Sequence, residues 1–299
     1  MTKVVQPLFA FFGTPLFAVR VLDALEAQDL LPALVITAPD KPRGRGMALT
    51  PSPVTVWARA RGIDVITPQT LKDDAFVAEL QNTQWEVFVV AAYGKLIPKN
   101  ILNIPRRECL NVHPSLLPRF RGPSPALSAI LADERSTGVS IMQMTEKKDA
   151  GPVVAQARVE IEEDAWPPKG SVLEDLLATE GGNLLAEVMP EWVVGKITPE
   201  PQDANKATYT KKFIDADAQI DPDDDARQNF LKIQAFDKNP RAYFIEPGNP
   251  STVLRARRVI ITEAEYKDKK LEILKVIPEG KKEIDFKIYR ASHGDTPSP

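Results

Sequence analysis

Residues 8–15 read Leu-Phe-Ala-Phe-Phe-Gly-Thr-Pro, and this stretch decides the expected fold. Five consecutive apolar residues are typical of a strand that is buried on both faces of a parallel sheet. Gly13-Thr14-Pro15 then turns the chain, and apolar residues recur at helical spacing over 17–26. A buried strand that leads into an amphipathic helix begins a βα unit, so we expect a parallel sheet with helices packed on it.

The same alternation of apolar runs and amphipathic stretches continues outward through the first half of the chain. It predicts strands over 33–37, 87–92, 110–113 and 139–144, and helices over 54–61, 75–80 and 124–132. The units are too few and too irregular for an eight-stranded barrel, so we expect a doubly wound, mostly parallel α/β sheet. Ligands bind such sheets beyond the carboxyl ends of the strands, which points to the segments after Phe12, Ala92 and Val112.

The composition excludes several classes of protein. The chain has 299 residues, 43% of them hydrophobic and 26% charged, which fits one large or two ordinary globular domains. No run approaches the roughly 20 apolar residues that span a bilayer, and residues 7–12 are too short for a signal sequence. A single cysteine, Cys109, allows neither an internal disulfide nor a metal site built on thiolates. We interpret the chain as cytoplasmic, and we expect it to be a monomer that holds no metal ion.

A polar, proline-containing stretch divides the chain. We interpret residues 195–207 as a linker between a catalytic domain over 1–194 and a second domain over 208–299. The second domain is predicted to contain a helix over 221–236, strands over 253–257, 259–261 and 271–274, and a disordered tail over 292–299. Several short strands in so small a region favour a β-barrel of the OB-like kind.

The charge pattern differs between the whole chain and the second domain. The net charge of −3 argues against binding nucleic acid through the bulk field, although only local charge matters at a contact. Residues 252–290 contain 11 Lys or Arg against 7 Asp or Glu. A basic barrel face suits the backbone of a nucleic acid, and a merely solvated surface gives the same count.

The densest cluster of residues that could take part in catalysis lies at 111–118, which read Asn-Val-His-Pro-Ser-Leu-Leu-Pro. If the preceding segment is extended, Asn111 and His113 lie on the same face of the strand. An amide can donate to a developing oxyanion, and an imidazole can take a proton near neutral pH. Asp149, in a turn-forming stretch, can orient that imidazole. Spacing alone leaves the ordinary reading open, because an Asn-x-His pair and a turn aspartate are both common.

Residues 111–118 resemble the N-x-H-x-S-L-L-P signature of the 10-formyltetrahydrofolate-dependent formyltransferases. The resemblance implies a Rossmann-like formyltransferase domain in which Asn111 and His113 hold and deprotonate an attacking amine and stabilise the tetrahedral intermediate. Asp149 falls where the family keeps a third catalytic residue that supports the histidine. The donor implied is 10-formyltetrahydrofolate, without a metal. The folate site would be lined by Ser115, Leu116, Leu117 and Pro118, and by Tyr93, Gly94 and Leu96 of the segment 91–98, which looks like the pterin loop.

Three further stretches bear on the acceptor, which the signature alone leaves open among a glycinamide ribonucleotide, a nucleotide-linked sugar and aminoacyl-tRNA. Residues 12–18 are similar to the tRNA and sugar branches of the family. Residues 39–54 resemble the loop with which the tRNA branch enters the acceptor stem, which implies phosphate contacts from Lys41, Arg43 and Arg45. Residues 207–212, with Lys211 and Lys212, resemble the start of that branch's carboxy-terminal barrel. The acceptor implied is methionine carried on initiator tRNA.

Two other functions stay open on the sequence. A sugar-nucleotide formyltransferase can share the amino-terminal pattern and carry a different second domain. A non-catalytic nucleotide-binding α/β protein would grip phosphate with residues 13–15, but neither G-x-G-x-x-G nor a P-loop is present. The chain also departs from the family at Pro114, at 123–125 and at 150–152, and its barrel ends early, near Arg290.

Overall fold

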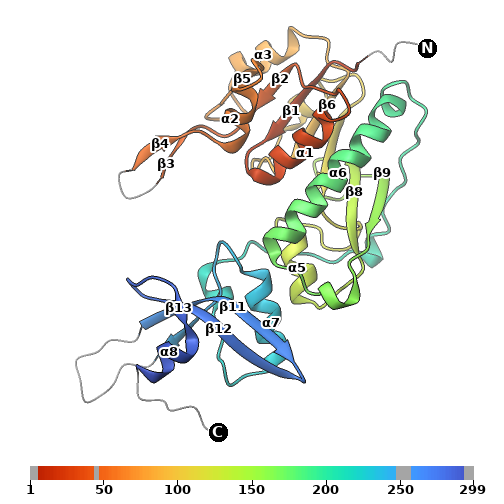
Figure 1. The fold of residues 1–299 in the computed structure, drawn as a ribbon. Coiled ribbons are helices and arrows are strands. Elements are labelled where there is room, and N and C mark those ends of the chain that lie inside the picture. The colour runs from red at the N-terminus through yellow and green to blue at the C-terminus, as the bar shows by residue number, and fades with distance from the viewer. Residues whose placement is uncertain (1–5, 44–46, 247–256, 293–299) are drawn as a thin grey trace. The chain divides into compact units, whose positions relative to one another are not determined.

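The computed structural model describes residues 6–43, 47–246 and 257–292. The chain forms two compact units (Figure 1). The first comprises 1–122, 136–160 and 174–209, and the second comprises 123–135, 161–173 and 210–299.

The first unit is built on a seven-stranded sheet in the order β5-β2-β1-β6-β7-β8-β9. Its parallel strands are β1 (Phe9–Gly13), β2 (Leu34–Ile36), β5 (Asp64–Ile66), β6 (Val87–Ala91) and β7 (Cys109–His113). Antiparallel strands β8 (Thr137–Gln143) and β9 (Val153–Val159) complete the β7 edge. The predicted doubly wound, mostly parallel sheet is therefore confirmed.

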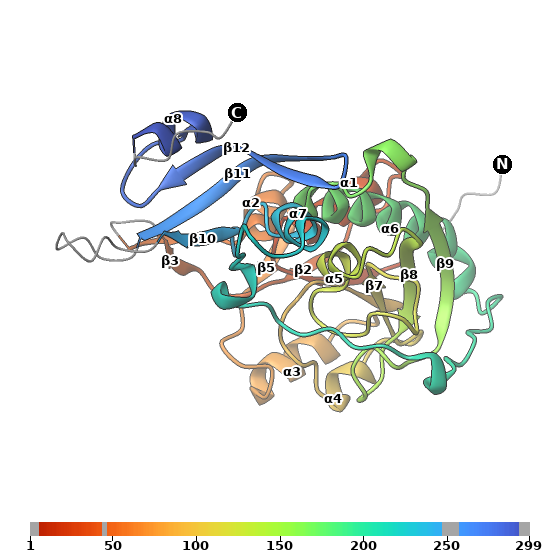
Figure 2. The ribbon, with the colours of Figure 1, turned by 90° about the horizontal axis from the view of Figure 1, so that it is seen from below.

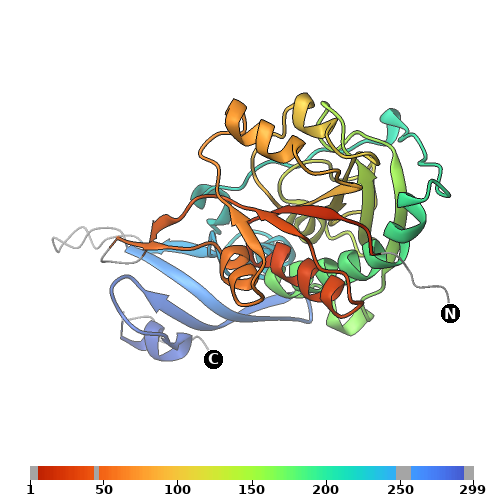
Figure 3. The same cartoon turned by 90° about the horizontal axis from the view of Figure 1, so that it is seen from above.

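Helices cover both faces of this sheet, as Figures 2 and 3 show. They are α1 (Leu16–Glu26), α2 (Pro53–Arg59), α3 (Asp74–Gln81), α4 (Lys99–Leu102) and α6 (Gly170–Val193). Residues of α1, α2 and α6 share one buried apolar cluster with Phe9 and Phe11. Residues of α3 and α4 share the other with Phe12. Strand β1 is thus buried on both faces, which is why its apolar run is continuous.

Helix α6, which the sequence analysis did not predict, packs closely behind strand β7. A Cβ atom at Gly181 would lie 2.4 Å from Cγ1 of Val112, and one at Gly182 would lie 2.8 Å from the carbonyl oxygen of Val21. Two adjacent glycines therefore let the helix approach β7 and α1 more closely than any side chain would allow. Val112 lies between Asn111 and His113, so α6 supports that strand from the opposite face.

A short hairpin follows strand β2 where the sequence analysis expected only a loop. Strands β3 (Lys41–Arg43) and β4 (Ala48–Thr50) pair antiparallel and project from the seven-stranded sheet (Figure 1). The chain then enters α2, whose first turn is capped by Ser52, because its Oγ accepts from the backbone N–H of Thr55. The Ser52 hydroxyl also lies 2.8 Å from Oγ1 of Thr37 at the end of β2. Buried hydroxyls thus fix the base of the hairpin.

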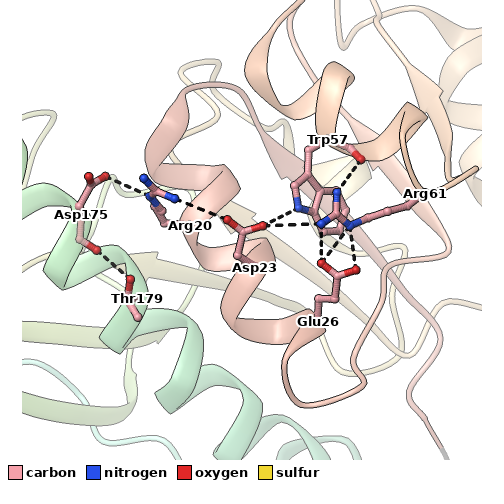
Figure 4. Close-up of polar contacts among 7 residues, drawn as sticks. All are labelled: Arg20, Asp23, Glu26, Trp57, Arg61, Asp175 and Thr179. Atoms are coloured by element: carbon pink, nitrogen blue, oxygen red, sulfur yellow. Dashed lines mark hydrogen bonds and ion pairs between the residues drawn. The ribbon is translucent and has the colours of Figure 1, made fainter.

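A polar network on the surface joins helices α1, α2 and α6 (Figure 4). The guanidinium of Arg61 lies 2.6 Å from Glu26 and 4.1 Å from the ring centroid of Trp57. The indole N–H of Trp57 donates to Asp23 at 2.7 Å. The hydrogen bond from Arg61 holds the pKa of Glu26 below its usual value. The network therefore stabilises α2 against α1 while Glu26 is ionised.

We expect Arg61→Ala to lower the free energy of unfolding by about 1 kcal/mol at pH 7, because it removes an exposed ion pair and a cation–π contact. Since the folded-state pKa of Glu26 is depressed, the ion pair contributes above the unfolded pKa of about 4.3 and is lost as the pH falls through the lower folded value. Urea unfolding at pH 7 and pH 3 measures this, with exposed Arg59→Ala on α2 as the control. A difference between Arg61→Ala and wild type that stays equally large at pH 3 would contradict the assignment.

The second unit contains a small antiparallel sheet with helices. Its strands, in the order β10-β11-β12-β13, are β10 (Tyr243–Glu246), β11 (Arg257–Lys267), β12 (Lys270–Pro278) and β13 (Ile284–Asp285). Its helices are α5 (Pro125–Leu131), α7 (Ala226–Ala235) and α8 (Phe286–Ala291). The strands predicted over 259–261 and 271–274 are confirmed within β11 and β12. Of the strand predicted over 253–257, residues 253–256 lie outside the described residues. The tail predicted to be disordered also lies there, except Ser292.

One detail of this unit, the start of its first long helix, differs from the prediction. The helix predicted over 221–236 begins only at Ala226, because the side chain of Asp225 accepts from the backbone N–H of Gln228 and caps the helix there. The four strands form a small antiparallel sheet, which is consistent with the small β-rich second domain that was expected.

The division into units also differs from the predicted linker at 195–207. Those residues lie in the first unit, where Glu200 and Val153 form a β-bridge. Conversely, segments 123–135 and 161–173 lie in the second unit. Asp133 there accepts from Arg227 of α7 at 2.7 Å and from the indole N–H of Trp166 at 2.7 Å. Contacts between segments that are distant in sequence accompany this division of the chain into two units, and local composition does not reveal such contacts.

Within the described residues, no helix combines the length and apolar character that a membrane span requires.

Candidate active site

Three neighbouring parallel strands end at the carboxyl edge of the large sheet. Strands β1, β6 and β7 lie side by side there and lead into the segments that follow Gly13, Ala91 and His113. The first two segments are in close contact, because the Thr14 hydroxyl donates to the carbonyl of Tyr93 at 3.3 Å. The three segments singled out from the sequence thus follow neighbouring strands at one edge of the sheet, which is the edge where α/β sheets bind ligands.

Asn111 and His113 lie on the same face of β7, as the alternation predicts. Leu110 and Val112 belong to the apolar cluster that includes α6, whereas Cys109 belongs to the cluster of α3 and α4. Asn111 and His113 therefore share the face of Cys109. Asn111 is half-buried, and His113 is 4% exposed. An amide and an imidazole are thus adjacent at the end of a fixed strand.

The imidazole of His113 is held by a backbone carbonyl. Its Nε2 lies 3.0 Å from the carbonyl oxygen of Phe120, and the neutral ring that donates this bond carries its lone pair on Nδ1. Burial lowers the pKa of His113, and the nearby charge of Asp149 and the bond to Phe120 oppose that effect. The ring is therefore neutral at pH 7 and able to accept a proton.

Asp149 interacts with His113 electrostatically, while its carboxylate is hydrogen-bonded to the backbone of another loop. Oδ2 accepts from the backbone N–H of Gly122 at 2.8 Å, and Asp149 itself has a left-handed backbone with φ of 51°. The imidazole itself is hydrogen-bonded to the Phe120 carbonyl, and Asp149 acts on it through its charge. A negative charge held near a buried imidazole stabilises its protonated form. The predicted support of His113 by Asp149 is consistent with this electrostatic arrangement.

The segment 115–118 forms a turn whose conformation is fixed by strands β8 and β9. Ser140 donates to the carbonyl of Ser115 at 2.6 Å and accepts from the backbone N–H of Leu117 at 3.0 Å. Gln156 donates to the carbonyl of Leu117 at 2.9 Å, and the Leu117–Pro118 peptide bond is cis. Ser115 and Leu117 are buried, whereas Leu116 and Pro118 are half-buried. Of these four predicted folate-lining residues, the buried Ser115 and Leu117 shape the turn, whereas Leu116 and Pro118 have exposed surface.

The segment after β6 combines a rigid ring with an exposed apolar side chain. The ring of Tyr93 packs edge-on against Phe12 at 5.5 Å, and burial raises the pKa of Tyr93 to about 12. Its hydroxyl is buried and has no hydrogen-bond partner among the described residues. Gly94 has φ of 80°, which favours glycine, and Leu96 is 77% exposed. This segment thus combines an exposed apolar side chain with a buried hydroxyl that has no partner among the described residues.

The predicted tRNA-binding cations lie in both units. Lys41 is exposed on β3, close enough to Lys95 to contribute to the lowering of the Lys95 pKa, of which burial is the larger cause. Arg43 ends β3, and Arg45 lies outside the described residues. Lys211 and Lys212 belong to the second unit, where Lys211 forms a 2.5 Å ion pair with Asp217. Lys211 is thus already engaged, and Lys212 is exposed.

Sequence reasoning missed the groups that hold the predicted catalytic side chains. The carbonyl of Phe120 and the amide of Gly122 are backbone groups, so no residue type reveals them. Gln202, in the predicted linker, is hydrogen-bonded to Arg121 and to the carbonyls of Asp149 and Gly151. The only sequence signal for Gln202 was its polar character within a proline-containing stretch.

The doubly wound sheet and the polar groups at its carboxyl edge place the chain among the α/β proteins that bind ligands at that edge. The chain belongs to the formyl transferase family, whose model matches residues 6–188, more than half of the chain.

One relative is similar in sequence, and two solved structures are similar in fold. The chain is 42% identical over 246 residues to a methionyl-tRNA formyltransferase of Chloroflexus aurantiacus, which covers 82% of this chain and 78% of that protein. A solved methionyl-tRNA formyltransferase from Clostridium thermocellum is similar in fold, with a TM-score of 0.58 at 15% identity, over 92% of this chain and 99% of that one. HypX from Aquifex aeolicus, solved in complex with tetrahydrofolic acid, has a TM-score of 0.65 at 15% identity, over 96% of this chain and 47% of that one.

Proposed function

We propose that this chain transfers the formyl group of 10-formyltetrahydrofolate to the amino group of methionine on initiator tRNA. The observation that carries the proposal is the 42% identity, over 82% of the chain, to a relative named methionyl-tRNA formyltransferase. The buried neutral imidazole beside an amide at the carboxyl edge of the sheet supports acyl transfer as the chemistry.

The proposed reaction proceeds through a tetrahedral intermediate. The neutral amine attacks the formyl carbon, and the carbonyl oxygen gains charge that Asn111 stabilises by donating a hydrogen bond. His113 accepts the proton from the amine and returns it to the leaving nitrogen of the folate. The charge of Asp149 stabilises the imidazolium that exists between these two steps.

The residues present fit a folate donor. The turn 115–118 offers Leu116 and Pro118, and the segment after β6 offers Leu96 and the unpartnered Tyr93 hydroxyl. Apolar surface with few polar groups is the usual lining of a site for a flat, partly aromatic ligand. Titration with tetrahydrofolate, followed by fluorescence, tests this fit directly. Saturable binding supports the proposal, and the absence of binding would favour a simple nucleotide-binding protein.

The acceptor would contact cations in both units. We propose that the β3–β4 hairpin, with Lys41, Arg43 and Arg45, binds the acceptor stem and that residues 208–299, with Lys211 and Lys212, contact the tRNA backbone. Support comes from the exposed position of Lys41 on a projecting hairpin. Phosphate contacts of this kind contribute affinity without reading sequence.

We expect the double substitution Arg43→Ala and Arg45→Ala to weaken tRNA binding and to reduce the slope of log K against log salt by about 2, roughly one for each phosphate that a guanidinium no longer neutralises. Filter binding over a range of salt concentrations measures both quantities. The matched control replaces exposed Lys72 and Lys99 by alanine, which removes the same charge elsewhere on the first unit. Equal tRNA affinity and equal salt slope in the two double variants would show that the hairpin is a solvated surface that does not contact tRNA.

A further inference from the structure

Gln202 connects the two loops that surround His113. Its side-chain N–H groups donate to the carbonyl of Asp149 at 3.1 Å and to the carbonyl of Gly151 at 2.6 Å. Its side-chain oxygen accepts two bonds from Arg121, at 3.0 Å from Nε and 2.7 Å from Nη2. One half-buried carboxamide therefore bonds to both loops at once, and each of its polar atoms is used.

Each of these loops carries a group that acts on His113. Arg121, which is 5% exposed, lies between Phe120 and Gly122 in the first loop. The Phe120 carbonyl binds the imidazole, and the Gly122 amide binds the carboxylate of Asp149 in the second loop. A buried guanidinium without its acceptor moves toward solvent or another partner, because an unsatisfied buried charge is costly. Loss of Gln202 would therefore displace both loops.

A second contact from the same segment holds Phe120 independently. The Thr208 hydroxyl accepts from the backbone N–H of Phe120 at 2.8 Å, and the Thr208 carbonyl accepts from the N–H of Arg121 at 2.9 Å. Phe120 has φ of 56°, a left-handed conformation that a non-glycine residue keeps only when its surroundings enforce it. Gln202, in the predicted linker, and Thr208, just after it, thus both bind the loop that carries Phe120 and Arg121.

We propose that Gln202 is a positioning residue, which fixes the Phe120 carbonyl and Asp149 around His113 by bonding to both of their loops. The proposal rests on the proposed function, because it assumes that His113 takes part in formyl transfer. Gln202 would touch neither substrate, so its removal changes the rate of the chemical step far more than the binding of tRNA or folate.

Gln202→Glu gives the sharpest test. Glutamate keeps the acceptor for Arg121 but cannot donate to the carbonyls of Asp149 and Gly151, so the second loop is released while the buried charge stays satisfied. We expect kcat for formyl transfer to fall by up to about 100-fold, with KM for methionyl-tRNA within about twofold of wild type and with little change in the melting temperature. Gln202→Leu, which releases both loops, should lower kcat at least as much and also lower the melting temperature.

Controls separate positioning from a general effect on folding. Glu200→Gln changes an exposed side chain of the same segment, and we expect it to behave as wild type. Thr208→Val removes only the hydroxyl bond to Phe120 and should lower kcat without altering KM. A wild-type kcat in Gln202→Glu, or a rise in KM that accounts for the whole loss, would overturn the proposal.

A final experiment measures the rate of the double variant that combines Gln202→Glu with Asp149→Asn. If Gln202 acts through Asp149, the double variant should be at most about twofold slower than Asp149→Asn alone, because residues that act as a unit are non-additive. Fully multiplicative losses would overturn the positioning role and leave the proposed function intact. A wild-type rate in Asp149→Asn alone would instead contradict the proposed site itself.

Discussion

Replacement of His113 by alanine is expected to slow formyl transfer by about 10²–10⁴-fold, the usual loss when a general base is removed. The structure gives the reason, because burial lowers the pKa of His113 and its Nε2 is bound to the Phe120 carbonyl, which leaves a neutral ring with one basic nitrogen. Folate binding should change little, since the proposed folate-lining residues 93–96 and 115–118 are left unaltered.

The measurement is single-turnover formyl transfer, with tetrahydrofolate binding measured in parallel. A variant that keeps more than about a tenth of the wild-type rate would exclude His113 as the general base. The pH profile gives a second check. Because the pKa of His113 is lowered, titration of this imidazole should reduce the wild-type rate only below about pH 6.5, the ordinary value for histidine, and any decline at higher pH, which protonation of the attacking amine causes, should persist in His113→Ala.

Replacement of Asn111 by alanine is expected to lower kcat by about 10²–10³-fold, because an oxyanion loses a preorganised hydrogen-bond donor. Asn111 is fixed on β7 between neighbouring strands β6 and β8, with Val90 and Met142 as its register partners. Asn111→Asp retains the shape but has no N–H groups to donate when ionised, so we expect at least as large a loss. Steady-state kinetics distinguish kcat from KM. Near wild-type kcat in the aspartate variant would show that Asn111 does not donate to the transition state.

The parts of the fold that sequence predicted well are those with a single dominant pattern. Strand β1 is buried on both faces, so its apolar run is continuous, and α1 has its apolar residues on one face. Helix α6 was missed because Gly181, Gly182 and Pro190 interrupt a helix that is nonetheless stabilised by close packing on β7 and α1. The hairpin β3–β4 was missed because its strands are three residues each and one contains Pro42.

The candidate site likewise has some features that local sequence predicts and others that it does not. The shared face of Asn111 and His113 follows from the alternation of one strand, so it was predictable from local sequence. The placement of Asp149 near His113 came from resemblance to a family, since 36 residues separate them along the chain. Gln202 acts through backbone carbonyls of distant loops, and only the folded structure brings them within hydrogen-bonding distance. Local pattern cannot encode such contacts.

The acceptor is identified by transfer of labelled formyl from 10-formyltetrahydrofolate, with methionyl-tRNA and a nucleotide-linked amino sugar offered in parallel. We expect labelled formyl-methionyl-tRNA as the product, no labelled sugar, and loss of the product in His113→Ala. Labelled sugar without labelled tRNA would contradict the proposed acceptor while retaining the formyl transfer chemistry. The absence of label from both acceptors would contradict the proposed function.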